Sequence, residues 1–274
     1  MSRALPVLLV VWASAGLALT LQLTGRMARR GWLSATLTAA AVIQTALIAW
    51  RWALSGHPPI LGTFENVLAA TWFLGALLVW AELRGAAYRD VIHVSYLPWI
   101  LALLAWGLRY PVRITPLTIS EQSIWVDIHA AAAWLAFAAF LFAFGLAVLT
   151  LVSRCRAEPP AWLPQRPELD RSMLRSLSLT FIAASVMMAT GAWYSLVLFG
   201  RWLVWEVVLV CALVLWLGLA VAVHARLFFG WRGRRLAWVV VLLLPAAVLT
   251  FWVWSAYRGT YHSFDFQLLR AGDL

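Results

Sequence analysis

Histidines are the residues of this chain best suited to hold a metal, and there are five of them: His57, His93, His129, His224 and His262. His129 lies in the first turns of one long apolar segment, and His262 follows the last such segment. Neutral imidazole is a good ligand for iron, so two of these rings at one membrane depth could grip a porphyrin iron from both sides. The alternative is that each is an interfacial histidine that meets water and lipid headgroups, the interpretation we adopt for His93.

The short turn between the sixth and seventh apolar segments reads F-G-R-W-L-V-W-E from residue 199 to residue 206. A porphyrin is a flat apolar disc with two anionic propionates, so it needs aromatic faces and cationic groups. The aromatic candidates are Phe199, Trp202 and Trp205, and the cationic candidates are Arg201 in the turn and Arg258 near His262. An ordinary aromatic belt at a membrane interface is the alternative, because the chain has 19 tryptophans.

His224 lies near the end of the seventh apolar segment, and Glu206 begins the same segment. The 18 residues between them correspond to about 27 Å of helix, nearly the thickness of a bilayer. These two side chains therefore cannot serve one site. His224 could ligate a second haem deeper in the protein, or it could be an interfacial histidine.

The elements that must position these residues are membrane-spanning helices. Of the 274 residues, 64% are hydrophobic and 12% are charged, whereas a soluble domain carries roughly 25% charged residues. The apolar residues form blocks of the length that crosses a bilayer as helix, in which each segment satisfies its own backbone amides. We predict an all-α bundle of eight transmembrane helices at Leu5–Leu23, Trp32–Trp50, Phe64–Leu83, Val91–Leu108, Ile124–Val152, Leu174–Phe199, Leu203–Phe229 and Leu236–Tyr257.

Arginine placement predicts the orientation of these helices. All 21 basic residues are arginines, and counting them loop by loop gives fourteen on one side and seven on the other. The richer side is predicted to be cytoplasmic, which puts both termini on the outer, extracytoplasmic side. Four segments whose residues could bind a ligand or a metal are then on the outer side of the membrane: Gly56–Glu65, Asp127–His129, Gly200–Glu206 and Tyr257–Phe266. The basic loops are explained by topology, so the net charge of +10 does not indicate nucleic-acid binding.

One polar connection, Ser153–Met173, is long, and its four prolines predict an irregular loop. The sequence shows no internal repeat, so we expect a single polytopic domain over residues 1–274. Cys155 and Cys211 are too few and too far apart for a disulfide framework or a metal site, and we expect two unpaired thiols.

Several short segments resemble, in order, motifs of the CcmC/CcsA cytochrome c assembly family, whose members handle haem at a tryptophan-rich outer loop. Gly200, Arg201 and Trp205, followed by Glu206 in place of aspartate, match that loop, which reads W-G-R-Y-W-S-W-D-P-K-E. The other matches are Pro59 and Glu65 (P-x-x-N-x-x-E, with Gly62 for asparagine), His129 (first external histidine), Thr190-Gly191-Ala192 (T-G-A), Val223–Leu227 (L-H-A-R-L), Gly230–Arg234 (basic turn) and Gly259–Phe264 (G-x-x-H-S-[YF]). The resemblance covers a core of about residues 57–266.

This resemblance implies non-covalent, b-type haem with His129 and His262 as external axial ligands. It makes Phe199, Arg201, Trp202, Trp205 and Glu206, with Arg258, the haem platform, and His224 a transmembrane haem ligand. The implied function is to hold and present haem for attachment to apocytochrome c, beside other assembly proteins of the bacterial cytoplasmic (inner) membrane. The thiol nucleophiles would come from the apocytochrome, and we expect the chain to be at most one component of a haem–cytochrome c ligase system.

The chain departs from the family loop at several positions. Phe199 and Leu203 occupy two tryptophan positions, and Val207-Val208-Leu209 replaces P-K-E, a pattern closer to the shorter HemX-like branch. Two other functions stay open at this point. A b-type cytochrome subunit for electron transfer would need paired histidines in the hydrocarbon region, and a haem-free scaffold or regulator would have kept the fold and lost the site.

Overall fold

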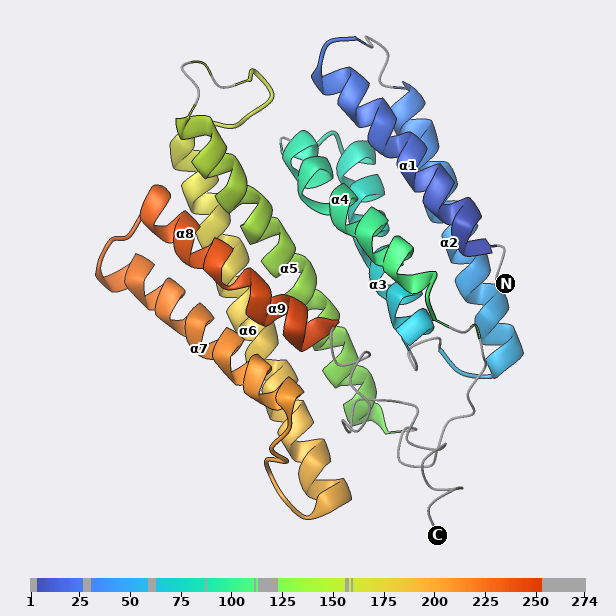
Figure 1. Cartoon of the computed structure of the whole chain (residues 1–274), viewed down its shortest axis with the longest axis vertical. Coiled ribbons are helices and arrows are strands. Elements are labelled where there is room, and N and C mark those ends of the chain that lie inside the picture. The colour runs from blue at the N-terminus through green and yellow to red at the C-terminus, as the bar shows by residue number, and fades with distance from the viewer. Residues whose placement is uncertain are drawn as a thin grey trace. The chain divides into compact units, whose positions relative to one another are not determined.

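The computed structural model describes residues 4–26, 31–58, 63–86, 88–110, 112, 123–155, 158 and 160–252 (Figure 1). Within these ranges the chain is helical and contains no strand, which confirms the all-α prediction. The helices are α1 (Ala4–Leu23), α2 (Gly31–Ser55), α3 (Thr63–Leu83), α4 (Arg89–Gly107), α5 (Ile124–Arg154), α6 (Arg166–Phe199), α7 (Val207–Phe228), α8 (Arg234–Leu242) and α9 (Leu244–Phe251).

Eight segments are long and apolar enough to cross a membrane: α1 to α7, and α8 with α9 as one. The chain is therefore a multi-pass membrane protein with the number of spans predicted from its apolar blocks. The orientation, with both termini outside, stays a prediction from the arginine count.

Helix α6 begins earlier than the sequence suggested. The prediction of an irregular loop as far as Met173 is wrong from Arg166 onward, because Pro167 occupies the first turn of the helix. Proline is favoured there, where its missing N–H removes no helical hydrogen bond and its fixed φ suits the helix. The helix has 34 residues and is about 51 Å long, well beyond the roughly 30 Å hydrocarbon layer.

The last span is interrupted between α8 and α9. Leu243 separates α8 from α9, and Pro245 lies in the first turn of α9. A proline cannot donate the backbone hydrogen bond that would continue the helix, so the apolar block predicted as one segment forms two shorter helices. The residues after Trp252, including the rest of the predicted Leu236–Tyr257 segment, lie outside the described residues.

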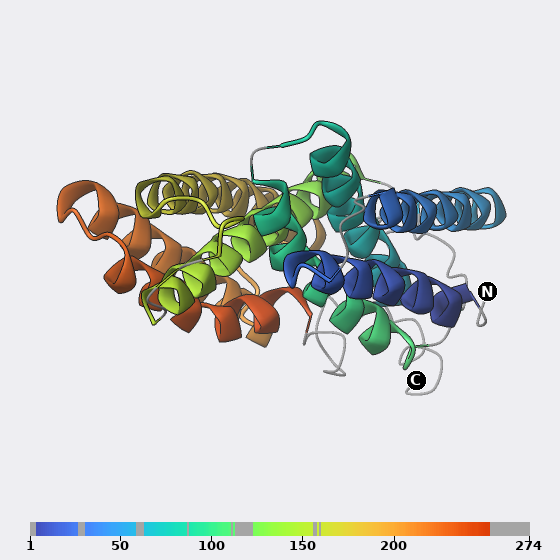
Figure 2. The same cartoon turned by 90° about the horizontal axis from the view of Figure 1, so that it is seen from above.

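The helices group into two compact units, which we describe separately. Unit 1 comprises residues 1–116 with 160–163, and unit 2 comprises residues 117–159 with 164–274. The single domain over residues 1–274 stays a prediction. In unit 1, each of α1 to α4 packs chiefly against two neighbours, α1 on α2 and α4, and α3 on α2 and α4 (Figure 2).

Unit 1 is held together at its centre by a buried polar cluster. The side chain of Gln44 accepts a hydrogen bond from Trp12 Nε1 (3.1 Å) and donates to the Leu68 carbonyl (2.9 Å) and to Thr71 Oγ1 (2.7 Å). Gly75 provides the space for Trp12, since a Cβ there would lie 2.6 Å from the indole ring. Because lipid offers no hydrogen-bond partners, this cluster ties α1, α2 and α3 together.

Unit 2 is built on the packed pair α5 and α6, with α7 against α6 and the α8–α9 segment against α5 and α7 (Figure 1). Helix α5 carries a stripe of buried alanines at helical spacing: Ala132, Ala136, Ala139, Ala143 and Ala147. Small residues let neighbouring helices approach closely, which is how helices associate in lipid. The stripe begins three residues after His129, so the histidine lies at the start of a tightly packed helix.

Candidate functional site

The ring of His129 is held against α6 by a hydrogen bond to its backbone. His129 Nδ1 lies 2.8 Å from the carbonyl oxygen of Met187. A carbonyl can only accept, so the ring nitrogen donates and Nδ1 carries the proton. In the neutral ring the lone pair is then on Nε2, and this is the nitrogen that can ligate a metal.

Gly191 makes this close approach possible. A Cβ on Gly191 would lie 2.9 Å from His129 Cε1 and 3.1 Å from Nδ1, both closer than ordinary van der Waals contact. The missing side chain of Gly191, in the T-G-A segment, therefore lets the imidazole pack directly on the backbone of α6. Gly191 lies one turn after Met187, whose carbonyl orients the ring. Two neighbouring features of α6 fix the plane and tautomer of one ring on α5.

A row of tryptophans extends from this histidine toward the turn after α6. Trp125 lies one turn before His129 on α5, and its ring centre is 6.0 Å from that of Trp193 on α6. The ring of Trp193 lies in turn 6.1 Å from that of Trp202. The three rings are tilted by 54° and 58° within the row, so they form an aromatic surface at the end of unit 2 that carries His129.

The aromatic turn itself is ordered by a helix cap and a side-chain contact. Gly200 ends α6 in the left-handed conformation (φ 66°), and Ser195 Oγ donates to the carbonyl of Arg201 at 2.9 Å. The side chains predicted to support haem are exposed: Phe199 42%, Trp202 56% and Trp205 72%. Arg201 is also exposed, and Glu206 is the residue that precedes α7. The turn thus presents an apolar patch beside a guanidinium group.

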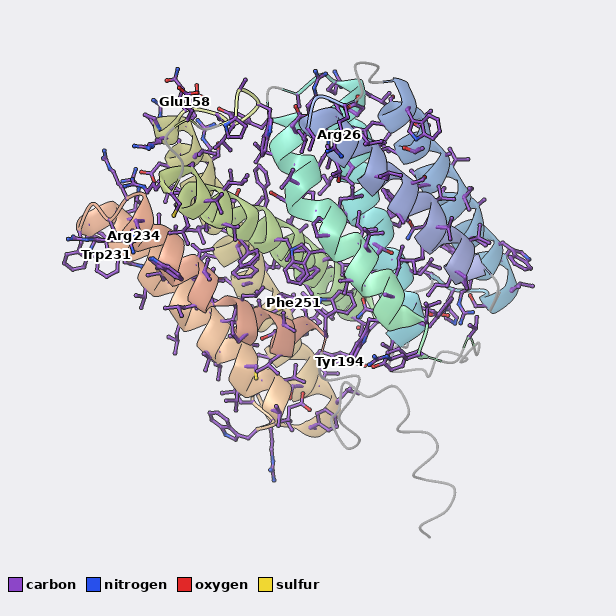
Figure 3. All side chains as sticks on the ribbon, turned by 45° about the horizontal axis from the view of Figure 1, so that its top comes forward. Arg26, Glu158, Tyr194, Trp231, Arg234 and Phe251 are labelled. Atoms are coloured by element: carbon purple, nitrogen blue, oxygen red, sulfur yellow. The ribbon has the colours of Figure 1, made fainter. Side chains whose placement is uncertain are left out.

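The end of α9 packs on α5, two turns from His129. The ring of Phe137 lies 5.2 Å from Phe251 and 5.3 Å from Trp252, and all three side chains are buried. Figure 3 shows Phe251 at this end of α9 and Tyr194 near the end of α6. His262 and Arg258, which the sequence assigned to the same site, lie outside the described residues.

His224 is not brought together with His129. His224 lies four residues before the end of α7, whereas the aromatic turn with Trp202 precedes the start of that helix. Its side chain is exposed, its Nδ1 donates to the Ala220 carbonyl at 2.7 Å, and its ring stacks on Phe228 at 5.6 Å. A role for His224 as ligand of a second haem stays a prediction.

In unit 1, the end of α2 and the start of α3 are joined by a buried ion pair. Arg51 Nε and Glu65 Oε1 lie 2.6 Å apart, and the two side chains are 0% and 3% exposed. The guanidinium also lies 5.2 Å from the centre of the Phe64 ring. Pro59 and Gly62 of the P-x-x-N-x-x-E resemblance are outside the described residues. The ion pair between Arg51 and Glu65 therefore joins α2 to α3.

Comparison with known proteins identifies the family. A model of the family described as Cytochrome C assembly protein matches residues 4–261, nearly the whole chain. This chain belongs to the cytochrome c assembly protein family.

The curated relatives of this family member are similar to it over most of their length. A "Cytochrome c biogenesis protein CcsA" of Synechococcus sp. (strain RCC307) is 26% identical over 237 residues, which cover 74% of this chain and 75% of that protein. A CcsA of Synechococcus sp. (strain WH7803) is 24% identical over 250 residues, covering 77% and 78%. A CcsA of Chlamydomonas reinhardtii is 24% identical over 233 residues, covering 80% and 64%.

In this cytochrome c assembly protein, the sequence alone does not identify Trp125, Trp193 or the carbonyl of Met187 as parts of the candidate site. Trp125 and Trp193 were not distinguished from the other tryptophans, although the first lies one helical turn from His129. The orienting acceptor is the backbone carbonyl of Met187, 58 residues away in sequence, which no side-chain pattern indicates. The T-G-A segment is the one sequence signal for Gly191, whose missing side chain leaves space for the His129 ring.

Proposed function

We propose that this chain holds haem non-covalently at the outer face of the membrane and presents it for attachment to apocytochrome c. The axial ligands in this proposal are His129 and His262, and the tryptophan row with the aromatic turn is the surface on which the porphyrin lies. Membership in the cytochrome c assembly family and relatives named cytochrome c biogenesis proteins support a role in cytochrome c maturation.

The orientation of the His129 ring is the observation that carries the proposal. Histidines that ligate metals almost always donate their other ring N–H to a carboxylate or a backbone carbonyl, which fixes the tautomer and raises the basicity of the ligand. His129 has this arrangement with Met187 at 2.8 Å. A histidine that only anchored the helix at the interface would not need a glycine beside its ring to make room for it.

The surroundings of His129 suit a porphyrin. The rings of Trp125, Trp193 and Trp202 offer the apolar faces against which a macrocycle packs. Arg201 supplies a cation next to them for one propionate. The exposed side chains of Phe199, Trp202 and Trp205 are available for packing against a macrocycle, although an aromatic belt at the membrane interface would expose them equally.

The chain between Trp252 and His262 is long enough for His262 to approach His129. Phe137, which contacts Phe251 and Trp252, is eight residues from His129, or about 12 Å along α5. Ten residues separate Trp252 from His262, and a chain of that length spans up to about 33 Å. The number of residues after Trp252 is therefore sufficient, in this proposal, for both imidazoles to reach one iron.

In this proposal, haem supplies the vinyl groups that form thioethers with the two thiols of a C-x-x-C-H apocytochrome. The residues of this chain hold and orient the macrocycle, neutralise its propionates and exclude water from one face. In this proposal the nucleophilic thiols belong to the apocytochrome partner, and the two cysteines of this chain, Cys155 at the end of α5 and Cys211 within α7, take no part. We also propose that the chain acts beside other membrane proteins of the assembly system, in a bacterial cytoplasmic membrane.

The decisive experiment is haem quantification by pyridine haemochrome on the full chain purified from haem-replete cells. The wild type is expected to carry haem, and a His129→Gly, His262→Gly double variant to carry much less. Exogenous imidazole is expected to restore the absorbance of the double variant, which a merely structural role for the two side chains would not produce.

Three results separate the alternatives. Equal haem in the wild type and the double variant would remove the outer site. A wild type without haem would favour a haem-free scaffold. Loss of half of the haem in a His224→Ala variant, with the remainder still sensitive to His129, would establish His224 as the ligand of a second haem.

A further inference from the structure

A cavity of about 610 Å³ lies at the arginine-rich end of unit 2, where α5 ends and the turn from α7 to α8 passes. Its lining includes Arg154, Arg232, Arg234, Arg235, Trp231 and Trp238. Figure 3 shows Trp231 and Arg234 together at this turn, while Tyr194 lies near the opposite end of the unit. The cavity is therefore separate from the His129 site, which is at the other end of the same helices.

The turn that lines this cavity is held in place by α6. The backbone N–H of Gly233 donates to Asp170 Oδ1 at 2.7 Å, and this bond is buried. Gly233 has a positive φ of 55°, and a Cβ at this position would collide with the guanidinium of Arg154. The arginine at the end of α5 thus lies beside the backbone of the turn, and its side chain, like those of Arg232, Arg234 and Arg235, is exposed.

The positive charge in this cavity is not balanced by the part of the chain that the structure describes. None of the four lining arginines forms an ion pair there, because Asp170 faces Arg226 at 4.0 Å and receives the Gly233 N–H. Arg234 and Arg235 occupy the first turn of α8, which has no acidic residue. Cations at a helix N-terminus oppose the helix dipole, and an anion bound beside them reduces this repulsion.

Arginine is the side chain best suited to phosphate, because its planar fork binds two oxygens at once. The cavity is much larger than one phosphate ion, and its tryptophan rings provide an apolar border on which acyl chains can lie. It also lies at the end of the membrane-spanning helices, on the side predicted to be cytoplasmic, where anionic lipid headgroups are enriched and arginine pockets between helices bind them.

We propose that this cavity binds the headgroup of an anionic phospholipid, with the phosphate held by Arg154, Arg232, Arg234 and Arg235 and the first methylenes against Trp231 and Trp238. The bound lipid neutralises the arginines at the start of α8 and fastens the α7–α8 turn to the end of α5. This site is independent of the haem proposal, since it uses no residue of the His129 end.

The test is native mass spectrometry of the full chain in detergent, titrated with phosphatidylglycerol or phosphatidylcholine. The pocket variant is Arg232→Gln, Arg234→Gln, Arg235→Gln. The matched control is Arg26→Gln, Arg84→Gln, Arg89→Gln, which removes the same charge from unit 1 on the same predicted side. We expect the wild type and the control to retain phosphatidylglycerol, and the pocket variant to bind it at least tenfold more weakly. Phosphatidylcholine is expected to bind weakly to all three.

Arg154→Lys gives a milder second variant in case the triple change prevents folding. It keeps the charge but loses the planar fork, so we expect a several-fold loss of phosphatidylglycerol affinity. Equal losses in the pocket variant and the control would reduce the effect to general charge attraction and overturn the proposal. Full displacement of the lipid by soluble glycerol 3-phosphate would also overturn it, because the cavity would then be a site for a soluble phosphate.

Discussion

Replacing Gly191 with alanine tests whether α6 positions the imidazole of His129. The added Cβ would lie 2.9 Å from His129 Cε1, whereas ordinary contact begins near 3.4 Å. The ring must therefore move by about 0.5 Å, the difference between these two distances. This displacement stretches the 2.8 Å hydrogen bond to the Met187 carbonyl, a bond of a kind that contributes roughly 0.5–1.5 kcal/mol.

The expected result is weaker haem binding in a protein that folds at least as well. Loss of the contact that orients a metal ligand typically lowers affinity about 10- to 100-fold, so we expect the dissociation constant for haem to rise by about tenfold. Alanine also has a higher helix propensity than glycine by about 1 kcal/mol, which favours α6. A decrease in haem affinity without a decrease in stability would thus separate positioning from folding.

The assay is a titration of haem into the apoprotein, followed at the Soret absorbance, with thermal denaturation of the same samples. Gly218→Ala in α7 is the matched control, because its Cβ collides with Leu243 of the α8–α9 segment and does not touch His129. An unchanged dissociation constant in Gly191→Ala would refute the reasoning. So would an equal increase in Gly218→Ala, since general disturbance of unit 2 would then explain both.

Three other changes have defined outcomes. Glu65→Ala leaves Arg51 buried without its carboxylate, and we expect a loss of about 3–5 kcal/mol in denaturation experiments in detergent, largely recovered by the double change Arg51→Met, Glu65→Met. Gln44→Leu leaves the buried Trp12 indole N–H without its acceptor, with an expected loss of about 1–3 kcal/mol in the same assay. Trp193→Ala interrupts the tryptophan row, and haem titration should show weaker binding with unchanged stability; equal affinity would exclude this ring from the haem surface.

The membrane spans were predictable because their signal is local. A block of about 20 apolar residues can do little else than cross the bilayer as a helix, so the ends of α3 and the start of α5 agree closely with the apolar blocks. The eight residues of α6 before Leu174 were missed because they are polar and contain Pro167, whose effect depends on its position in the helix. The break before Pro245 was missed because hydrophobicity continues across it.

The candidate site was predictable only in part, because its geometry depends on contacts between distant segments. His129 could be chosen from its residue type and its place at the start of a span. The acceptor for its N–H could not, since every residue has a carbonyl and only the packing of α5 on α6 selects the one at Met187. The ring pair Trp125 and Trp193 likewise depends on the register between these two helices.

The exceptional length of α6 has a consequence for how unit 2 is assembled. Asp170 near its start accepts a hydrogen bond from the Gly233 N–H, and the carbonyl of Met187 further along accepts one from His129 Nδ1. The 17 residues between them correspond to about 26 Å of rise, close to the hydrocarbon thickness. A single continuous helix thus fixes the distance between the arginine cavity and the His129 site at about the thickness of the hydrocarbon layer.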